Sequence, residues 1–158
     1  MEKIIVLGIG NQLMMDDGIG IYLVNELGKH PSAPNIFYLV GESDIDYCLE
    51  LIDGATFIMI VDAVLSGKEP GELSVFSLEE LHESQPLHIS PHNLHLFQEL
   101  YQQKETIAGY LIGIEPFELR FHIGLSDELI AKWDVVLKDV QRTIDELLAK
   151  RMIERLEK

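Results

Sequence analysis

The hydrophobic positions of the chain form short continuous runs that are separated by stretches with helical spacing. Continuous runs of β-branched and apolar residues are typical of strands that are buried on both faces of a sheet. The chain contains such runs at residues 4–7, 35–40, 56–61 and 107–114, and a further strand is predicted at residues 73–77. The pattern therefore predicts five strands.

Between these runs, apolar residues recur at the three- and four-residue spacing of helices. Residues 17–28 and 46–52 are predicted as helices, and a glycine lies at or just after the end of each. A third helix is predicted to run to Tyr101, with Ser90 as its cap and Pro91 in its first position.

The last predicted helix has the clearest pattern. Ser126 is a suitable cap, and Asp127 and Glu128 lie in the first turn, where acids complement the helix dipole. One apolar stripe follows, formed by Leu129, Trp133, Val136, Leu137, Val140, Ile144, Leu147 and Leu148. By contrast, the stretch after residue 77, through Gln85 and Pro86, is predicted to be a polar connection.

Strands that alternate with helices imply right-handed βαβ crossovers. We therefore expect an α/β fold, a three-layer sandwich in which a twisted, mainly parallel sheet has helices on both faces. The 158 residues suit one domain, residues 1–158, with a long C-terminal helix from about residue 126. Sites in such sheets form outside the carboxyl ends of the strands, here after Leu7, Val40 and Val61.

The composition narrows the class of partner. Twelve Lys and Arg against 27 Asp and Glu give a net charge of −15, which disfavours nucleic acid and anionic membrane surfaces and favours cations. The single cysteine, Cys48, excludes an internal disulfide and a cysteine-based zinc site, and it suits the reducing cytoplasm. No run is long enough to predict a membrane span or a signal peptide.

The segment GIGNQLMMDDGIG, residues 8–20, follows the first strand where a nucleotide loop would be expected. The dinucleotide pattern needs a third glycine where this chain has Leu13, and the phosphate loop needs a lysine that the segment lacks. Asp16 and Asp17 stand at the helix N-terminus, where they would repel a phosphate. The hypothesis that the chain is a nucleotide-binding Rossmann-like module is therefore less favoured.

Asp17, Asp62 and His92 are the candidate site residues. Asp62 directly follows an apolar strand, and His92 lies in the first turn of a predicted helix, where the helix dipole favours the neutral, metal-binding imidazole. Two carboxylates and an imidazole suit a divalent transition metal with open positions. Structural roles remain alternatives: Asp16 can cap the helix, with Asp17 in its first turn, and Asp62 can cap a turn.

The sequence gives less support to two other hydrolytic mechanisms, a cysteine nucleophile and an aspartic dyad. Cys48 lies on a short amphipathic helix, which indicates core packing rather than a nucleophile. A dyad of Asp17 and Asp62 that shares a proton, as in aspartic proteases, is conceivable but leaves His92 without a role.

The segment 8–20 also resembles the hydrogenase maturation proteases, whose pattern is G-x-G-N-x-L-x-x-D-D/E-G-x-G. This chain matches it at Gly8, Gly10, Asn11, Leu13, Asp16, Asp17, Gly18 and Gly20. Three further segments resemble the family in the same order, namely IVDA at 60–63, SPHNL at 90–94 and GIEP at 113–116. The resemblance spans most of residues 4–125.

The resemblance implies an endopeptidase that removes a C-terminal extension from the nickel-loaded precursor of a nickel-iron hydrogenase large subunit. Nickel supplied by the precursor, or another divalent cation, would be bound by Asp17, Asp62 and His92, which would also be the catalytic residues. Many relatives are glycine-rich where this chain has Gly41-Glu42-Ser43-Asp44-Ile45. The role of that segment and of Asp16, the hydrogenase processed, the cleavage sequence, the general base and the oligomeric state stay open.

A non-proteolytic nickel-binding checkpoint protein in hydrogenase assembly is the alternative from a different class. It would use the same three residues, and the sequence alone does not separate the two, because no conventional nucleophile is visible. The partner would in either case be the hydrogenase large-subunit precursor.

Overall fold

The computed structural model describes residues 2–84, 95–99, 102 and 107–157. Five strands form one sheet in the order β2-β1-β3-β5-β4. The strands are β1 (Ile4–Ile9), β2 (Ile36–Glu42), β3 (Phe57–Ala63), β4 (Leu73–Ser77) and β5 (Ala108–Ile114). All pairings are parallel except that of β4 with β5, so the prediction of a mainly parallel sheet is confirmed.

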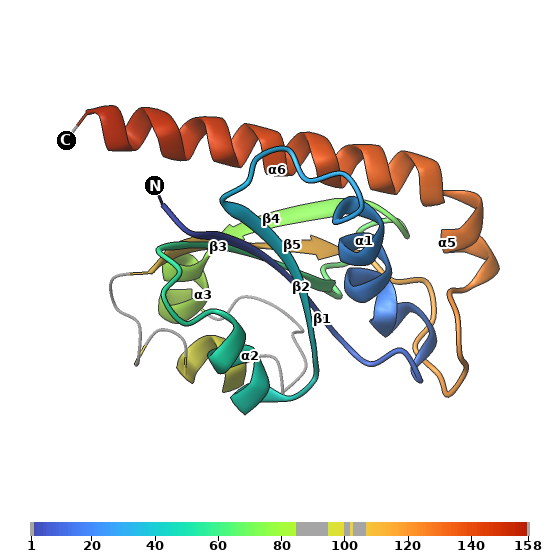
Figure 1. The fold of residues 1–158 in the computed structure, drawn as a ribbon. Coiled ribbons are helices and arrows are strands. Elements are labelled where there is room, and N and C mark those ends of the chain that lie inside the picture. The colour runs from blue at the N-terminus through green and yellow to red at the C-terminus, as the bar shows by residue number, and fades with distance from the viewer. Residues whose placement is uncertain (1, 85–94, 100–101, 103–106, 158) are drawn as a thin grey trace.

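Helices cover both faces of this sheet (Figure 1). The described elements are the 3₁₀ turn η1 (Met15–Gly18) and the helices α1 (Ile19–Leu27), α2 (Ile45–Leu51), α3 (Leu78–Ser84), α5 (Asp127–Ala131) and α6 (Trp133–Leu156). Residues 95–99 are also helical. No helix in these described parts is both long and apolar enough to cross a membrane.

The alternation of side chains along the strands divides the core into two layers. Along β3, Met59 and Val61 pack with α1, α5 and α6 on one face, whereas Ile58 and Ile60 pack with α2, α3 and residues 95–99 on the other. The three-layer α/β sandwich expected from the sequence is therefore observed.

Helix α3 was not expected, because the stretch after β4 looked like a polar connection. Its N-terminus is a capping box: Ser77 Oγ accepts a hydrogen bond from Glu80 N at 3.0 Å, and the Glu80 carboxylate accepts one from Ser77 N at 2.9 Å. Leu81 is buried in the core. The S-x-x-E pattern of this box is visible in the sequence, so the helix could have been predicted from it.

The long C-terminal helix is confirmed in place but is broken at Lys132, between α5 and α6. Ser126 caps α5 as predicted, because its side chain accepts a hydrogen bond from Leu129 N. Leu129 and Val136 lie in the same buried layer, so the break allows both segments to pack on the sheet. Lys132 Nζ donates to the Pro70 carbonyl at 2.8 Å.

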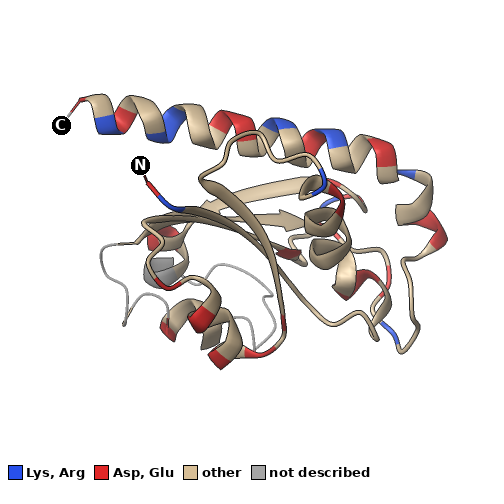
Figure 2. Ribbon diagram, in the orientation of Figure 1, with Lys and Arg blue, Asp and Glu red and all other residues tan. Residues whose placement is uncertain are grey.

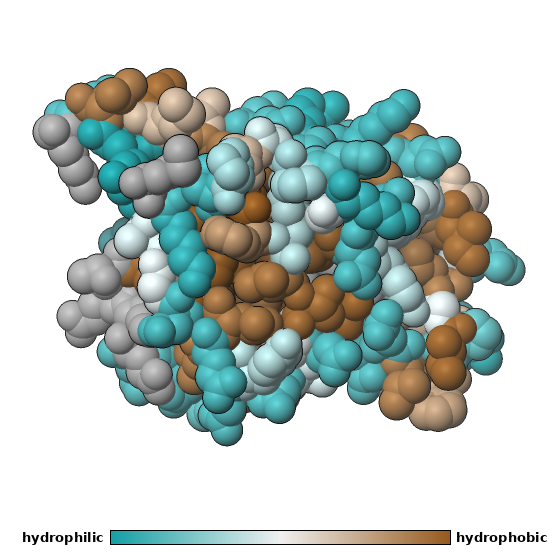
Figure 3. Space-filling model, in the orientation of Figure 1, coloured by the Kyte–Doolittle hydropathy of each residue, from teal (hydrophilic) through white to brown (hydrophobic). Residues whose placement is uncertain are grey.

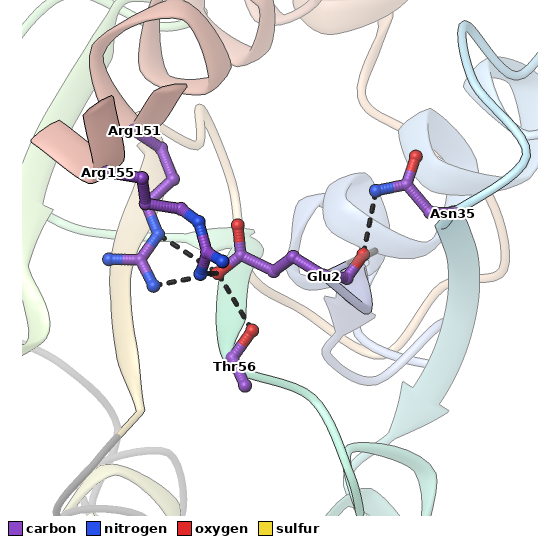
Figure 4. Close-up of polar contacts among 5 residues, drawn as sticks. All are labelled: Glu2, Asn35, Thr56, Arg151 and Arg155. Carbon is purple, nitrogen blue, oxygen red and sulfur yellow. Dashed lines mark hydrogen bonds and ion pairs between the residues drawn. The ribbon is translucent and has the colours of Figure 1, made fainter. Parts of the chain in front are cut away.

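Glu2 ties the far end of α6 to the amino ends of the strands (Figure 4). Its Oε1 accepts hydrogen bonds from Arg151 Nη2 at 2.7 Å and Thr56 Oγ1 at 2.8 Å, and Arg155 Nη1 lies 3.2 Å away. The Glu2 carbonyl also accepts a hydrogen bond from the Asn35 side chain at 2.7 Å. A largely buried carboxylate with this many donors is a stabilising contact.

The variant Glu2→Gln is therefore expected to lose about 1–3 kcal/mol of unfolding free energy at pH 7. Burial raises the pKa of Glu2, but the hydrogen bonds from Arg151 and Thr56 and the arginine charges outweigh it, so the pKa lies below its ordinary value of 4.5. The stabilisation is then complete above about pH 4.5 and lost as the pH falls through the lowered pKa of the folded state.

Urea unfolding of both proteins at pH 7 and at pH 3 measures this effect. The difference between wild type and Glu2→Gln should be larger at pH 7. An equal difference at the two pH values would contradict the electrostatic origin of the contact.

The basic residues are concentrated on the C-terminal helix α6. Five of the 12 Lys and Arg residues lie on α6, where they alternate with acids (Figure 2). The excess of acid is therefore carried by the rest of the chain, which includes the carboxyl ends of the strands.

Candidate active site

The candidate site lies where the strand order reverses. The chain passes from β1 to β2 on one side and then to β3 on the other side of β1, so the switch point lies between β1 and β3. Ligands of open α/β sheets bind in the crevice outside this point. Because Gly8 pairs with Val61 in the parallel register, the residues that follow each of them lie next to one another.

Gly10 lies next to both of the predicted acids, Asp17 and Asp62. Its φ of 138° is in the range that favours glycine. A β-carbon built on Gly10 would overlap the carbonyl oxygen of Asp17 and would lie 3.7 Å from Asp62 Oδ1. The Asp17 backbone, from the turn after β1, and the Asp62 carboxylate, from the end of β3, therefore lie beside the same glycine.

Asp17 lies in η1, which precedes α1, rather than in the first turn of the α-helix as expected. Its Oδ2 accepts a hydrogen bond from Asn11 N at 2.9 Å. Burial raises the pKa of the Asp17 carboxyl, and the Asn11 hydrogen bond opposes this only in part. Asp17 is half-buried, in contrast to its fully buried neighbour Asp16.

Asp62 is fully buried and forms part of β3, one residue before the strand ends. Its Oδ1 accepts a hydrogen bond from Ala63 N at 2.8 Å. The strand alternation places Asp62 on the same face as Ile58 and Ile60. Burial of a carboxylate is costly unless it is hydrogen-bonded, paired or bound to a cation.

His92, with the predicted helix start at Ser90 and Pro91, lies outside the described residues. The helical residues 95–99 that follow bury Leu96 and Phe97 on the face of the sheet to which Asp62 belongs. Within the residues that the structure describes, no three His, Cys, Asp or Glu side chains are grouped as metal ligands. The described part thus contains two of the three residues predicted as ligands, Asp17 and Asp62.

Asp16 has a role that the sequence did not reveal. The prediction that it caps the helix is wrong: Met14 occupies the cap position of η1, without a side-chain hydrogen bond. Asp16 is instead fully buried, and its carboxylate accepts hydrogen bonds from Phe117 N, Glu118 N and both Ser126 N and Ser126 Oγ, at 2.7–2.9 Å. It fastens the segment after β5 to the turn that carries Asp17.

Substituting Gly10 tests how closely the site is packed. In Gly10→Ala the β-carbon would displace the Asp17 carbonyl, so we expect a loss of about 2–4 kcal/mol of unfolding free energy. Gly67→Ala is the matched control, since Gly67 also has a positive φ of 82° but no atom within 4 Å of the new β-carbon. Its expected cost is about 1 kcal/mol. Equal costs in urea unfolding would contradict the close packing at Gly10.

The segment Gly41-Glu42-Ser43-Asp44-Ile45 borders the same turn. Glu42 ends β2 with a positive φ of 55°, and its carbonyl accepts a hydrogen bond from Gly10 N at 3.0 Å. Glycine adopts this conformation freely, whereas other residues pay about 1–2 kcal/mol. The acid therefore stands where the backbone favours a glycine.

Cys48 is excluded as a nucleophile by its surroundings. It is buried, its thiol donates to the Gly41 carbonyl at 3.5 Å, and burial together with the charge of Asp44 raises its pKa to about 11. The thiolate that nucleophilic chemistry needs is therefore scarce at neutral pH.

The largely apolar groove lined by Ile4, Ile36, Leu148 and Met152 lies at the amino ends of the strands. This is the sheet edge opposite the acids, so the groove is not part of the candidate site.

Fold and site together define a class: an α/β domain with two acids at the switch point of its sheet, held by a glycine turn unsuited to phosphate. The model of the hydrogenase maturation protease family matches residues 21–143. The chain belongs to the hydrogenase maturation protease family, and it is a hydrolase that acts on peptide bonds.

Two kinds of relative agree with this assignment. The hydrogenase 2 maturation protease of Escherichia coli K12 is 30% identical, over 91% of this chain and 92% of the relative. The structure of the hydrogenase maturating endopeptidase HybD from E. coli superposes with a TM-score of 0.77 at 28% identity, covering 92% and 93% of the two chains. The HybD maturation protease from Thermococcus kodakarensis gives a TM-score of 0.71 at 27% identity, covering 90% and 99%.

Proposed function

We propose that this protein removes a C-terminal extension from the nickel-loaded precursor of a nickel-iron hydrogenase large subunit. The observation that carries the proposal is the placement of Asp17 and Asp62 around Gly10. The family supplies the reaction class, and the names of the relatives point to a hydrogenase as the protein that is matured.

Nickel is part of the substrate in this scheme. It would dock between the carboxylates of Asp17 and Asp62, with His92 as the third ligand. Oxygen and neutral imidazole ligands together suit a divalent transition metal, and three protein ligands leave positions for groups of the precursor. The excess of acid on the protein favours the approach of a cation.

The reaction adds water across one peptide bond near the end of the precursor. The oxygen of water forms a bond to the carbonyl carbon, the carbon–nitrogen bond breaks, and the departing amine takes a proton. The docked metal can polarise the scissile carbonyl or lower the pKa of a water molecule, and a nearby carboxylate can accept the proton. Either effect requires the metal in the substrate, which restricts cleavage to loaded precursor.

The reaction is proposed to take place in the cytoplasm, where the chain's one cysteine would stay reduced. In this scheme the protein cleaves only precursor that has received its metal. The protein would act as a check on metal insertion as well as a protease.

The test compares purified precursor with and without nickel as substrate. We expect the large subunit to be shortened only in the nickel-loaded sample, as seen by mass spectrometry. Equal cleavage of metal-free precursor would overturn the metal requirement. Stable binding of loaded precursor without any cleavage would favour the non-proteolytic checkpoint protein, and saturable binding of NAD or ATP would favour the nucleotide-binding reading.

A further inference from the structure

Five large apolar side chains are exposed on two segments that meet beside the candidate site. We call them the apolar rim: Leu13, Phe117, Leu119, Phe121 and Ile123. Phe121 is 77% exposed and Ile123 is 72% exposed. In the space-filling view, hydrophobic surface gathers at the lower right, where these two segments lie in Figure 1 (Figure 3).

The two segments are joined by their backbones. His122 N donates to the Leu13 carbonyl at 2.8 Å, and Met15 N donates to the His122 carbonyl at 2.9 Å. These bonds form a parallel bridge between Met14 and His122. The rim residues on the two segments are therefore neighbours in space although they are distant in the sequence.

Apolar and polar residues alternate through the rim segment from Phe117 to Ile123, and its backbone is bonded to the rest of the protein. Glu118 N donates to Asp16, and the Glu118 carboxylate pairs with Arg120 Nε at 3.3 Å. All residues of the segment are exposed, so its apolar side chains form part of the surface. A rim fixed in this way loses little conformational freedom on binding, which favours affinity.

The rim is also fastened to the site itself. Asp16, which accepts hydrogen bonds from Phe117 N and Glu118 N of the rim segment, is followed directly by Asp17. A protein whose peptide bond reaches Asp17 must therefore pass close to the rim. Clustered apolar exposure of this kind marks an interaction surface more often than isolated exposed residues do.

We propose that the apolar rim docks on an apolar surface of the folded precursor, next to the tail that is cleaved. This inference rests on the proposed function. Docking of the folded body would hold the scissile bond at Asp17 and Asp62 and raise the effective concentration of the tail there. A second copy of this chain is a poorer occupant, since it would cover the approach to Asp17.

The test replaces two rim residues, in the double variant Phe121→Ser with Ile123→Ser. The matched control is Val135→Ser with Met152→Ser on α6, because these side chains are 63% and 66% exposed and lie away from the site. The rim variant is expected to raise KM for nickel-loaded precursor by roughly tenfold or more, with kcat changed less than about threefold. The control variant should keep the wild-type KM, and both should unfold at the wild-type temperature.

The possible results separate the two proposals. If wild type does not cleave loaded precursor, the proposed function fails first. If wild type cleaves it and the rim variant has an unchanged KM, the docking inference is overturned. It is also overturned if the control variant loses as much affinity as the rim variant, or if sedimentation shows a wild-type dimer that the rim variant abolishes.

Discussion

Replacement of Asp62 by asparagine is expected to lower the rate of precursor processing by at least about 100-fold. Asparagine keeps an oxygen that can accept the hydrogen bond from Ala63 N, so the fold should change little. It removes the negative charge that would bind nickel or accept a proton. The same result is expected for Asp17→Asn, whose oxygen can still accept from Asn11 N, and for His92→Ala.

The control for this series is Asp46→Asn, which makes the same chemical change at an exposed position in the first turn of α2. It should process precursor at the wild-type rate. Processing is measured from the mass of the large subunit, and folding from thermal unfolding. Full processing by Asp17→Asn, Asp62→Asn and His92→Ala would rule out their proposed role.

The second large effect is expected at Asp16, on stability. The variant Asp16→Ala removes the acceptor of four hydrogen bonds from a fully buried position, which should cost about 3–5 kcal/mol of unfolding free energy. Asp16→Asn should cost less, because its amide oxygen can take the Oδ2 position and keep three of the four hydrogen bonds, whereas its NH₂ group cannot accept from Ser126 N. Urea unfolding at pH 7 measures both.

Ser126→Ala provides the comparison. It removes one hydrogen bond to Asp16 and the side-chain cap of α5, and it should cost about 1–2 kcal/mol. If Asp16→Ala were less destabilising than Ser126→Ala, Asp16 would not be the anchor of the rim segment that its contacts indicate.

Much of the fold follows from local pattern. The strands were predicted within two residues of their observed ends, since a run such as Phe57–Ala63 is apolar on both faces and has no other stable environment. Helix α3 is polar along most of its length, and its only local signal is the capping box of Ser77 and Glu80. The break at Lys132 was not predictable, because the local pattern of both segments is helical and only packing of Leu129 and Val136 on one sheet requires it.

Some features of the candidate site could likewise be predicted from the sequence, and others could not. The positions of Asp17 and Asp62 after predicted strands, with the rule that carboxyl ends of parallel strands meet, made their proximity an expectation. The role of Asp16 had no local signal, since its partners lie about a hundred residues further along the chain. Nothing in the spacing of Phe117 to Ile123 indicated that these residues would lie against Leu13.

The sequence alone determined the five strands, most of the helices, the layer architecture and the family, because apolar periodicity and short motifs are local properties of the chain. Only the tertiary structure decided which acid borders the crevice and which acid is buried as an anchor. Asp16 and Asp17 are adjacent and chemically identical, and what distinguishes them is the set of backbone N–H groups that the rest of the fold brings to each.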